Sequence, residues 1–213
     1  MELKTGDILL FSESPKHCCM NCFDWLIKTC TCSRYSHSAL VIVDPAWCPA
    51  LKGTFVWEST WHGKPDPQDD DTKFGVQLTP LIHYTQQYPG SVRIWVRRAP
   101  CEIATEDEWI RIHDAVYNHK YDTRPYDWIS AALCRRIQRQ DDTFTCSAFV
   151  SYVLTKTNVL RADTCWTTVS AAELSAHRDS SLVTFLNPYG TDEYVGRFPN
   201  EDSELITIDG VNV

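Results

Sequence analysis

The order in which apolar segments occur along the chain is the feature that most limits its fold. Short apolar runs bounded by turn residues are typical of β-strands, and they fill the first half. The strand candidates cover 6–11, 36–43, 54–59, 75–79 and 91–97, with a last one near 205–208. Helical spacing predicts helices over 18–28, 127–137 and 146–154, and capping boxes at 105–108 and 170–173 open two more. Strands followed by helices predict an α+β fold, not an alternating parallel one.

Length and charge narrow the class of protein. The 213 residues suffice for a single domain over 1–213 whose core needs no disulfide or metal. A net charge of −8 argues against nucleic acid as a partner, because such proteins neutralise phosphates with a basic face. No apolar run approaches the roughly 18 residues of a transmembrane segment, and Ile8–Phe11 is too short for a signal peptide. We expect a cytoplasmic protein that is a monomer or a weak dimer.

Ten cysteines without a secretion signal indicate free thiols in a reducing compartment. Five of them lie between Cys18 and Cys32, next to His17, and offer enough ligands for zinc. The spacing of Cys30 and Cys32 does not match a zinc knuckle, and the first pair lies on a predicted helix. Packing thiols are therefore the favoured interpretation, with zinc binding or reversible acylation as alternatives.

The acidic run Asp69–Asp71 follows two prolines and is typical of a solvated loop tip. A cation site there is disfavoured, because the segment lacks the glycine and the distal glutamate of a calcium loop. We expect no metal and no organic cofactor.

Cys146 is the thiol best placed to be a nucleophile. It opens an apolar helix, so its sulfur lies near the positive end of the helix dipole, which lowers the pKa of a thiol. The free N–H groups of the first helical turn can also hold an oxyanion. The alternative is a small buried cysteine at a helix start.

His37 and Glu58 lie on adjacent predicted strands. If these strands pair antiparallel with His37 opposite Glu58, then Val41 lies near Thr54 and the two polar side chains share a face, with β-carbons about 4.5–5.5 Å apart. A carboxylate there can fix the tautomer of the imidazole, as in a catalytic triad. The alternatives are a core histidine and a carboxylate that faces water. We expect the remaining histidines to be surface residues: His17, His62, His83, His113, His119 and His177.

These residues stand within short motifs whose order along the chain is informative. The set resembles the circularly permuted branch of the papain-like, NlpC-type cysteine hydrolases, the YaeF/YiiX-like group that includes a poxvirus protein family. The resemblance covers about residues 5–155 and is carried by GDILL at 6–10, SRYSH at 33–37, VWEST at 56–60, GVQLTPL at 75–81, PYD at 125–127 and FTCSAFV at 144–150.

The resemblance implies a fold and a set of site residues. The fold would be a small antiparallel sheet or half-barrel packed against a few helices. His37 would be the base, Glu58 the third polar member and Cys146 the nucleophile, with the base before the nucleophile as permutation requires. Tyr126 would line the substrate pocket or assist the oxyanion, or else cap the core, and Ser147 would contact substrate. Thr145 and Ala148 replace the usual Asp and Gly, which argues against a peptidoglycan substrate.

The function implied is a cysteine-dependent hydrolase that cleaves an amide, ester or thioester bond of a small-molecule, peptide-like or lipid acyl substrate. Two alternatives remain open: a thiol acyltransferase acting on lipids, and a catalytically silent binding module on the same fold. The motifs at 58–60 and 75–81 are also consistent with a viral protein, which would be cytoplasmic or virion-associated.

Overall fold

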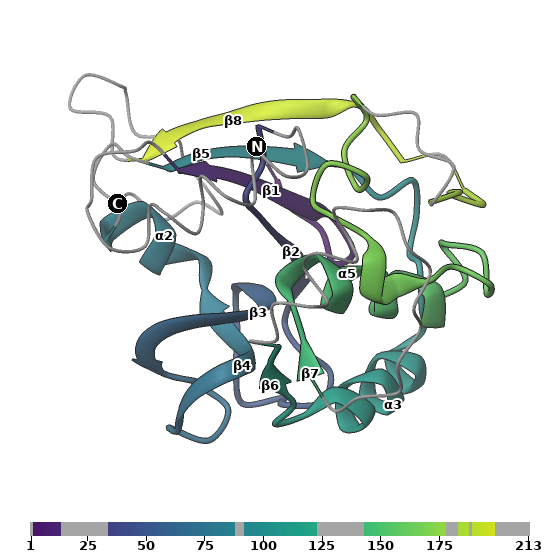
Figure 1. Cartoon of the computed structure of the whole chain (residues 1–213). Coiled ribbons are helices and arrows are strands. Elements are labelled where there is room, and N and C mark those ends of the chain that lie inside the picture. Colours follow the sequence, from purple (N-terminus) through teal and green to yellow (C-terminus); the bar gives the residue numbers. More distant parts are fainter. Residues whose placement is uncertain are drawn as a thin grey trace.

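One mixed sheet organises the computed structural model, which describes residues 2–13, 34–87, 92–122, 143–177, 183–187 and 189–198 (Figure 1). Within these residues the sheet has eight strands in the order β7-β6-β4-β3-β2-β1-β5-β8. The strands are β1 (Ile8–Glu13), β2 (His37–Val43), β3 (Thr54–Pro65), β4 (Thr72–Pro80), β5 (Val92–Arg97), β6 (Lys120–Tyr121), β7 (Thr143–Phe144) and β8 (Asp192–Phe198). All neighbours are antiparallel except β6 and β7, which are parallel. The predicted α+β class is confirmed, although the sheet is larger than expected and not purely antiparallel.

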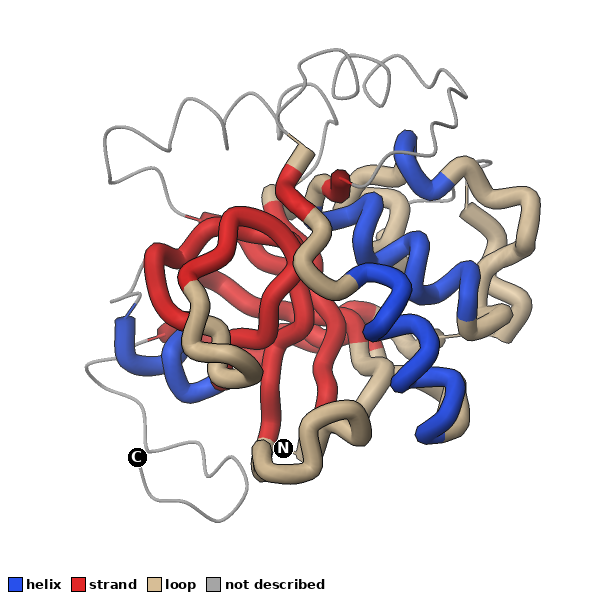
Figure 2. The backbone as a smooth tube through the Cα atoms, turned by 90° about the horizontal axis from the view of Figure 1, so that it is seen from below, coloured by secondary structure: helices blue, strands red, loops and turns tan. Residues whose placement is uncertain are grey.

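The described helices are α2 (Leu81–Gln87), α3 (Glu106–Val116) and α5 (Cys146–Lys156), with a short 3-10 turn, η1 (Trp166–Thr168). Figure 2 shows α2 apart from the others, at the opposite side of the sheet. The capping box predicted at the start of α3 is present, with Thr105 and Glu108 exchanging bonds to backbone N–H groups. The predicted helix over 18–28, the one over 127–137 and the strand near 205–208 lie outside the described residues.

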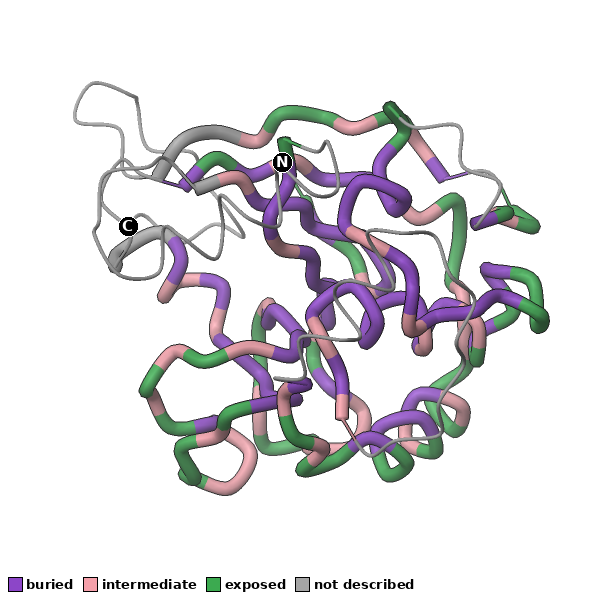
Figure 3. Tube along the Cα trace, viewed as in Figure 1, coloured by how far each residue is buried: buried purple, intermediate pink, exposed green. Residues whose placement is uncertain are grey.

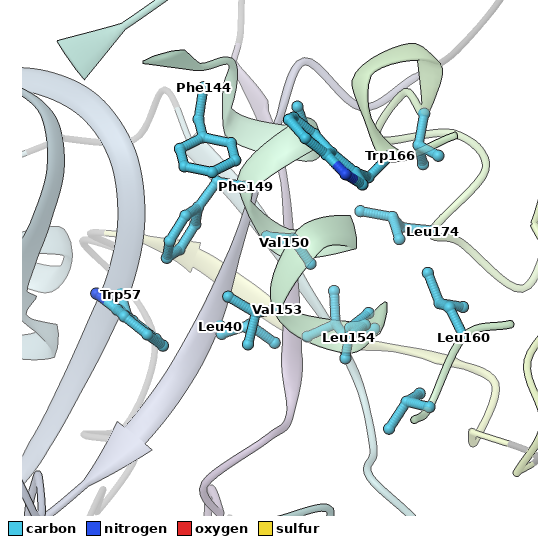
Figure 4. Close-up of a cluster of buried hydrophobic side chains, with 14 of the residues drawn as sticks. Leu40, Trp57, Phe144, Phe149, Val150, Val153, Leu154, Leu160, Trp166 and Leu174 are labelled. Carbon is cyan, nitrogen blue, oxygen red and sulfur yellow. The ribbon is translucent and has the colours of Figure 1, made fainter. Parts of the chain in front are cut away.

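Alternation along the strands separates two apolar clusters. On one face, the main cluster joins Leu40 and Trp57 of the sheet to Phe149 and Val153 of α5 (Figure 4). On the other face, Ala39 and Val56 pack with Tyr84 of α2. The central strands are therefore buried on both faces, as the buried colour through the middle of Figure 3 shows. This double burial explains why β2 is a continuous apolar run instead of an alternating one.

Helix α5 is fixed to the sheet at its first turn. Thr145 is its N-cap, and the Thr145 side chain accepts the N–H of Ala148. Just before the cap, the carbonyl of Phe144 accepts a hydrogen bond of 2.8 Å from the buried hydroxyl of Ser59 on β3. The residue at the helix start, Cys146, is thereby held against the middle of the sheet.

A close backbone approach seats β6 on β4. Gly75 pairs with Lys120, and a β-carbon on Gly75 would lie 2.1 Å from the carbonyl oxygen of His119. The same carbonyl accepts the N–H of Val76 at 2.9 Å. Only glycine allows this distance. The close approach of β6 to β4 in turn sets the position of Tyr121, the residue that follows Lys120.

The helix predicted to begin at Ser170 does not form, and residues 171–174 are turns. Glu173 accepts bonds from both the N–H and the hydroxyl of Ser170, so the hydroxyl no longer caps the helix. Ser175 donates to the carbonyl of Ala172, and Arg97 donates to that of Leu174. Side chains thus take carbonyls that a helix would need for its own hydrogen bonds.

The acidic loop between β3 and β4 is organised around an internal ammonium group. Lys73 Nζ lies 2.9 Å from the fully buried Asp66 and 2.6 Å from Asp69. Tyr117 also donates to Asp69. Asp69, at the start of the predicted solvated tip, therefore belongs to an ordered ion-pair network. The ammonium group of Lys73 occupies the position that a bound cation would take between these carboxylates.

None of the helices in the described part of the chain is long and apolar enough to cross a bilayer.

Replacing Gly75 by Ala should lower the free energy of unfolding by about 1–3 kcal/mol, as overpacking usually does, because β6 must move away from β4. Urea denaturation of both proteins measures the change. Gly53→Ala is the matched control, since Gly53 also has a positive φ of 103° but no atom within 4 Å of an added β-carbon. Equal losses for the two variants would show that the close approach is not what makes Gly75 necessary.

Candidate active site

Cys146 is the first residue of α5, as predicted, and only 7% of it is exposed. The backbone N–H groups of Ser38 and Ser147 and the side chain of His37 all lower the pKa of its thiol. Strand β2 and the start of α5 therefore meet at this sulfur. The surroundings of the thiol are those of a stabilised anion, in contrast to a cysteine packed only among apolar groups.

His37 lies between the sulfur and Glu58. Its Nε2 is 2.6 Å from Glu58 Oε2, which leaves Nδ1 for Cys146. The imidazole packs against the ring of Phe11, with 5.2 Å between centroids, and 20% of the side chain is exposed. His37 begins β2, so its ring stands at the end of the strand, where groups from both faces of the sheet can meet.

The register that brings His37 and Glu58 together differs from the predicted one. Val41 lies opposite Val56, not Thr54, so the pairing is displaced by two residues. A displacement of two preserves the face on which each side chain lies, because side chains alternate with period two. Continued along β2, the observed register makes His37 and Glu58 diagonal neighbours, and their long side chains span the gap.

Glu58 is fully buried, and three side chains donate to its carboxylate. Besides His37, Tyr84 places its hydroxyl 2.8 Å from Oε1 and 2.6 Å from Oε2, and His62 Nε2 is 3.0 Å from Oε1. A buried carboxylate needs such partners to stay charged. The alternative of a carboxylate that faces water is therefore wrong.

His62 was predicted to be a surface residue in a loop, and this prediction is wrong. His62 lies in β3, on the same face as Glu58. An interpretation that extended the strand past Ser59 would have found it, since residues 58, 60 and 62 share parity. His113 is also buried, and its Nε2 bonds to Gln68 Oε1 at 2.8 Å. Tyr84 had no comparable signal, because only the tertiary packing of α2 brings it to Glu58.

The pKa values of the site favour an ion pair. Burial alone would lower the pKa of His37, but the charges and hydrogen bonds of Cys146 and Glu58 raise it to about 10. Burial would raise the pKa of the Cys146 thiol, and His37 with the two backbone N–H groups lowers it instead. Burial likewise opposes ionisation of Glu58, yet His62 and His37 hold its pKa below the usual range. These shifts all favour the charged forms: a thiolate and an imidazolium beside an ionised carboxylate.

The first turn of α5 offers a place for a negatively charged oxygen. The N–H of Ala148 is taken by Thr145 and that of Ser147 by the sulfur. As the first residue of α5, Cys146 has no acceptor for its N–H within the helix. The Ser147 hydroxyl, predicted to contact substrate, donates instead to the carbonyl of Val169 at 2.7 Å. The Ser147 carbonyl also accepts a hydrogen bond, from Ser151 at 2.7 Å, so the described contacts of Ser147 are to the protein itself.

Tyr121 of β6, which the sequence did not indicate, lies opposite Phe144, two residues before Cys146. Burial and the charge of Cys146 both raise the pKa of its hydroxyl, which stays protonated. Tyr126, the tyrosine predicted for this pocket, lies outside the described residues, as does the cysteine cluster at 18–32. Among the residues that are described, no three His, Cys, Asp or Glu side chains form a metal-binding group.

Neither models of known protein families nor curated protein sequences match this chain.

Alkylation of Cys146 by iodoacetamide should be nearly independent of pH across the neutral range. Because His37 lowers the pKa of the thiol, we expect the thiolate to persist across this range and to be lost only at lower pH. In His37→Ala the pKa rises, leaving a few per cent of thiolate at pH 7 and slowing alkylation roughly 30-fold. Peptide mass spectrometry resolves Cys146 from the other thiols. His83→Ala, which removes a histidine outside these contacts, should match the wild type, and an unchanged profile in His37→Ala would refute the ion pair.

Proposed function

We propose that this protein is a cysteine-dependent hydrolase of the circularly permuted papain-like type. The observation that supports it best is the continuous contact from the Cys146 sulfur through His37 to the buried Glu58. Acyl transfer to sulfur requires a nucleophile, a base in contact with it, and a carboxylate that orients the base. A binding module has no need for a buried carboxylate that holds an imidazolium beside a thiolate.

In the first half of the reaction, the Cys146 thiolate attacks the carbonyl carbon of an amide, ester or thioester. The carbonyl oxygen becomes negative and accepts the N–H of Cys146 at the positive end of α5. His37 then gives its Nδ1 proton to the leaving group. The bond to that group breaks, and the acyl group remains on sulfur.

In the second half, His37 accepts a proton from water as the water oxygen attacks the acyl carbon. The carbon–sulfur bond breaks, the carboxylic acid leaves and the thiolate–imidazolium pair is restored. Glu58 holds Nε2–H of His37 throughout and stabilises the imidazolium. With an alcohol or amine in place of water, the same steps give acyl transfer.

Turnover of 4-nitrophenyl acetate, with intact-mass detection of an acetyl adduct, tests the proposal. Cys146→Ala should lose at least about 100-fold in kcat/KM and form no adduct at that position, because the nucleophile is gone. Cys165→Ala is the matched control, since Cys165 is also a buried free thiol. If Cys146→Ala retains the wild-type rate while Cys165→Ala behaves alike, Cys146 is not the nucleophile.

A further inference from the structure

Two large aromatic side chains stand exposed on the neighbouring strands β3 and β4. Trp61 of β3 is 50% exposed and Phe74 of β4 is 47% exposed. They are direct cross-strand partners, with their rings edge to face and 5.9 Å between centroids. Because the two rings are in contact, they form one contiguous apolar surface that is open to an apolar ligand.

This pair continues the apolar face that α5 covers. Along the β3–β4 ladder on this face, Trp57 pairs with Leu78 and Ser59 with Val76, and all four are buried. The next pair on the same face is Trp61 and Phe74, where the sheet emerges from beneath the helix. Ser59 is the residue that anchors Phe144, two positions before Cys146. The exposed aromatic pair therefore begins one ladder step beyond the attachment of the nucleophile.

A third ring connects the pair to the sulfur. Phe74 stacks on Tyr121, with 5.1 Å between centroids and 11° between the ring planes. Tyr121 of β6 lies opposite Phe144 of β7 in the sheet, and Phe144 is two residues before Cys146. Trp61, Phe74 and Tyr121, here called the aromatic row, thus lead from solvent to the candidate nucleophile.

We infer that the aromatic row binds the apolar acyl chain of the substrate whose carbonyl is attacked by Cys146. The inference rests on the proposed function and selects a lipid-like acyl group over a peptide-like one, because the row presents ring surface. Another copy of the chain is a poor occupant. Two half-exposed aromatic side chains supply on the order of 200 Å², against about 800 Å² per partner in a stable interface.

Two chain-length series test this inference, one with turnover and one without. The first compares kcat/KM for 4-nitrophenyl octanoate and acetate. The second compares alkylation of Cys146 by N-octyl and N-ethyl iodoacetamide, with the exposed Cys101 as an internal reference for reagent reactivity. On an open face, each methylene should gain roughly half of the free energy of full burial, which raises the rate about twofold. For six additional methylenes we therefore expect octyl preferences on the order of 50-fold in both series.

Trp61→Ala and Phe74→Ala should each reduce the preference for the octyl group at least about fivefold. Tyr194→Ala is the matched control, because Tyr194 is 55% exposed on β8 at the opposite edge of the sheet, and it should leave the preference unchanged. Acetate turnover without a chain-length preference, or a preference that both variants retain, overturns the inference and leaves the proposed function standing. A third outcome is possible: the protein hydrolyses neither ester, but the variants lose the preference for N-octyl iodoacetamide. That outcome supports the role of the aromatic row and contradicts the proposed function.

Discussion

The hydrogen bond between His37 and the buried Glu58 is the interaction on which the rest of the site depends. At 2.6 Å it joins the first residue of β2 to the interior of β3, and it leaves one imidazole nitrogen for Cys146. A carboxylate without solvent is costly unless donors surround it. His62 and Tyr84 supply those donors, so the charge on Glu58 is built into the fold from three elements: β2, β3 and α2.

The sheet presents these groups from its two faces. Glu58, His62 and Tyr84 lie on the face that α2 covers, while α5 packs against the other face and brings Cys146 to the end of β2. The imidazole at this strand end connects the two sides. Because α5 is anchored by the bond from Ser59 to Phe144, the separation of sulfur and imidazole is set by backbone and core contacts rather than by a loop.

Much of this arrangement could be predicted from local patterns, because the relevant signals are local. The strand at 36–43, the capped helix after Thr105 and the helix start at Cys146 follow from periodicity and capping. The predicted strand register was wrong by two residues, but His37 and Glu58 still share a face. An even displacement keeps each side chain on the same face, because side chains alternate with period two. The failed helix at Ser170 and the role of Tyr84 depend on Arg97 and on the packing of α2, which are long-range contacts that no sequence window contains.

Cys146 and Glu58 flank the imidazole of His37 and should together keep a second proton on it. Nitrogen-15 NMR of the imidazole, assigned by comparison with His37→Ala, measures this state directly. We expect both ring nitrogens of His37 to be protonated at pH 8 and the ring to titrate near its raised pKa of about 10. A neutral imidazole at pH 8, with an ordinary pKa near 6.5, would contradict it.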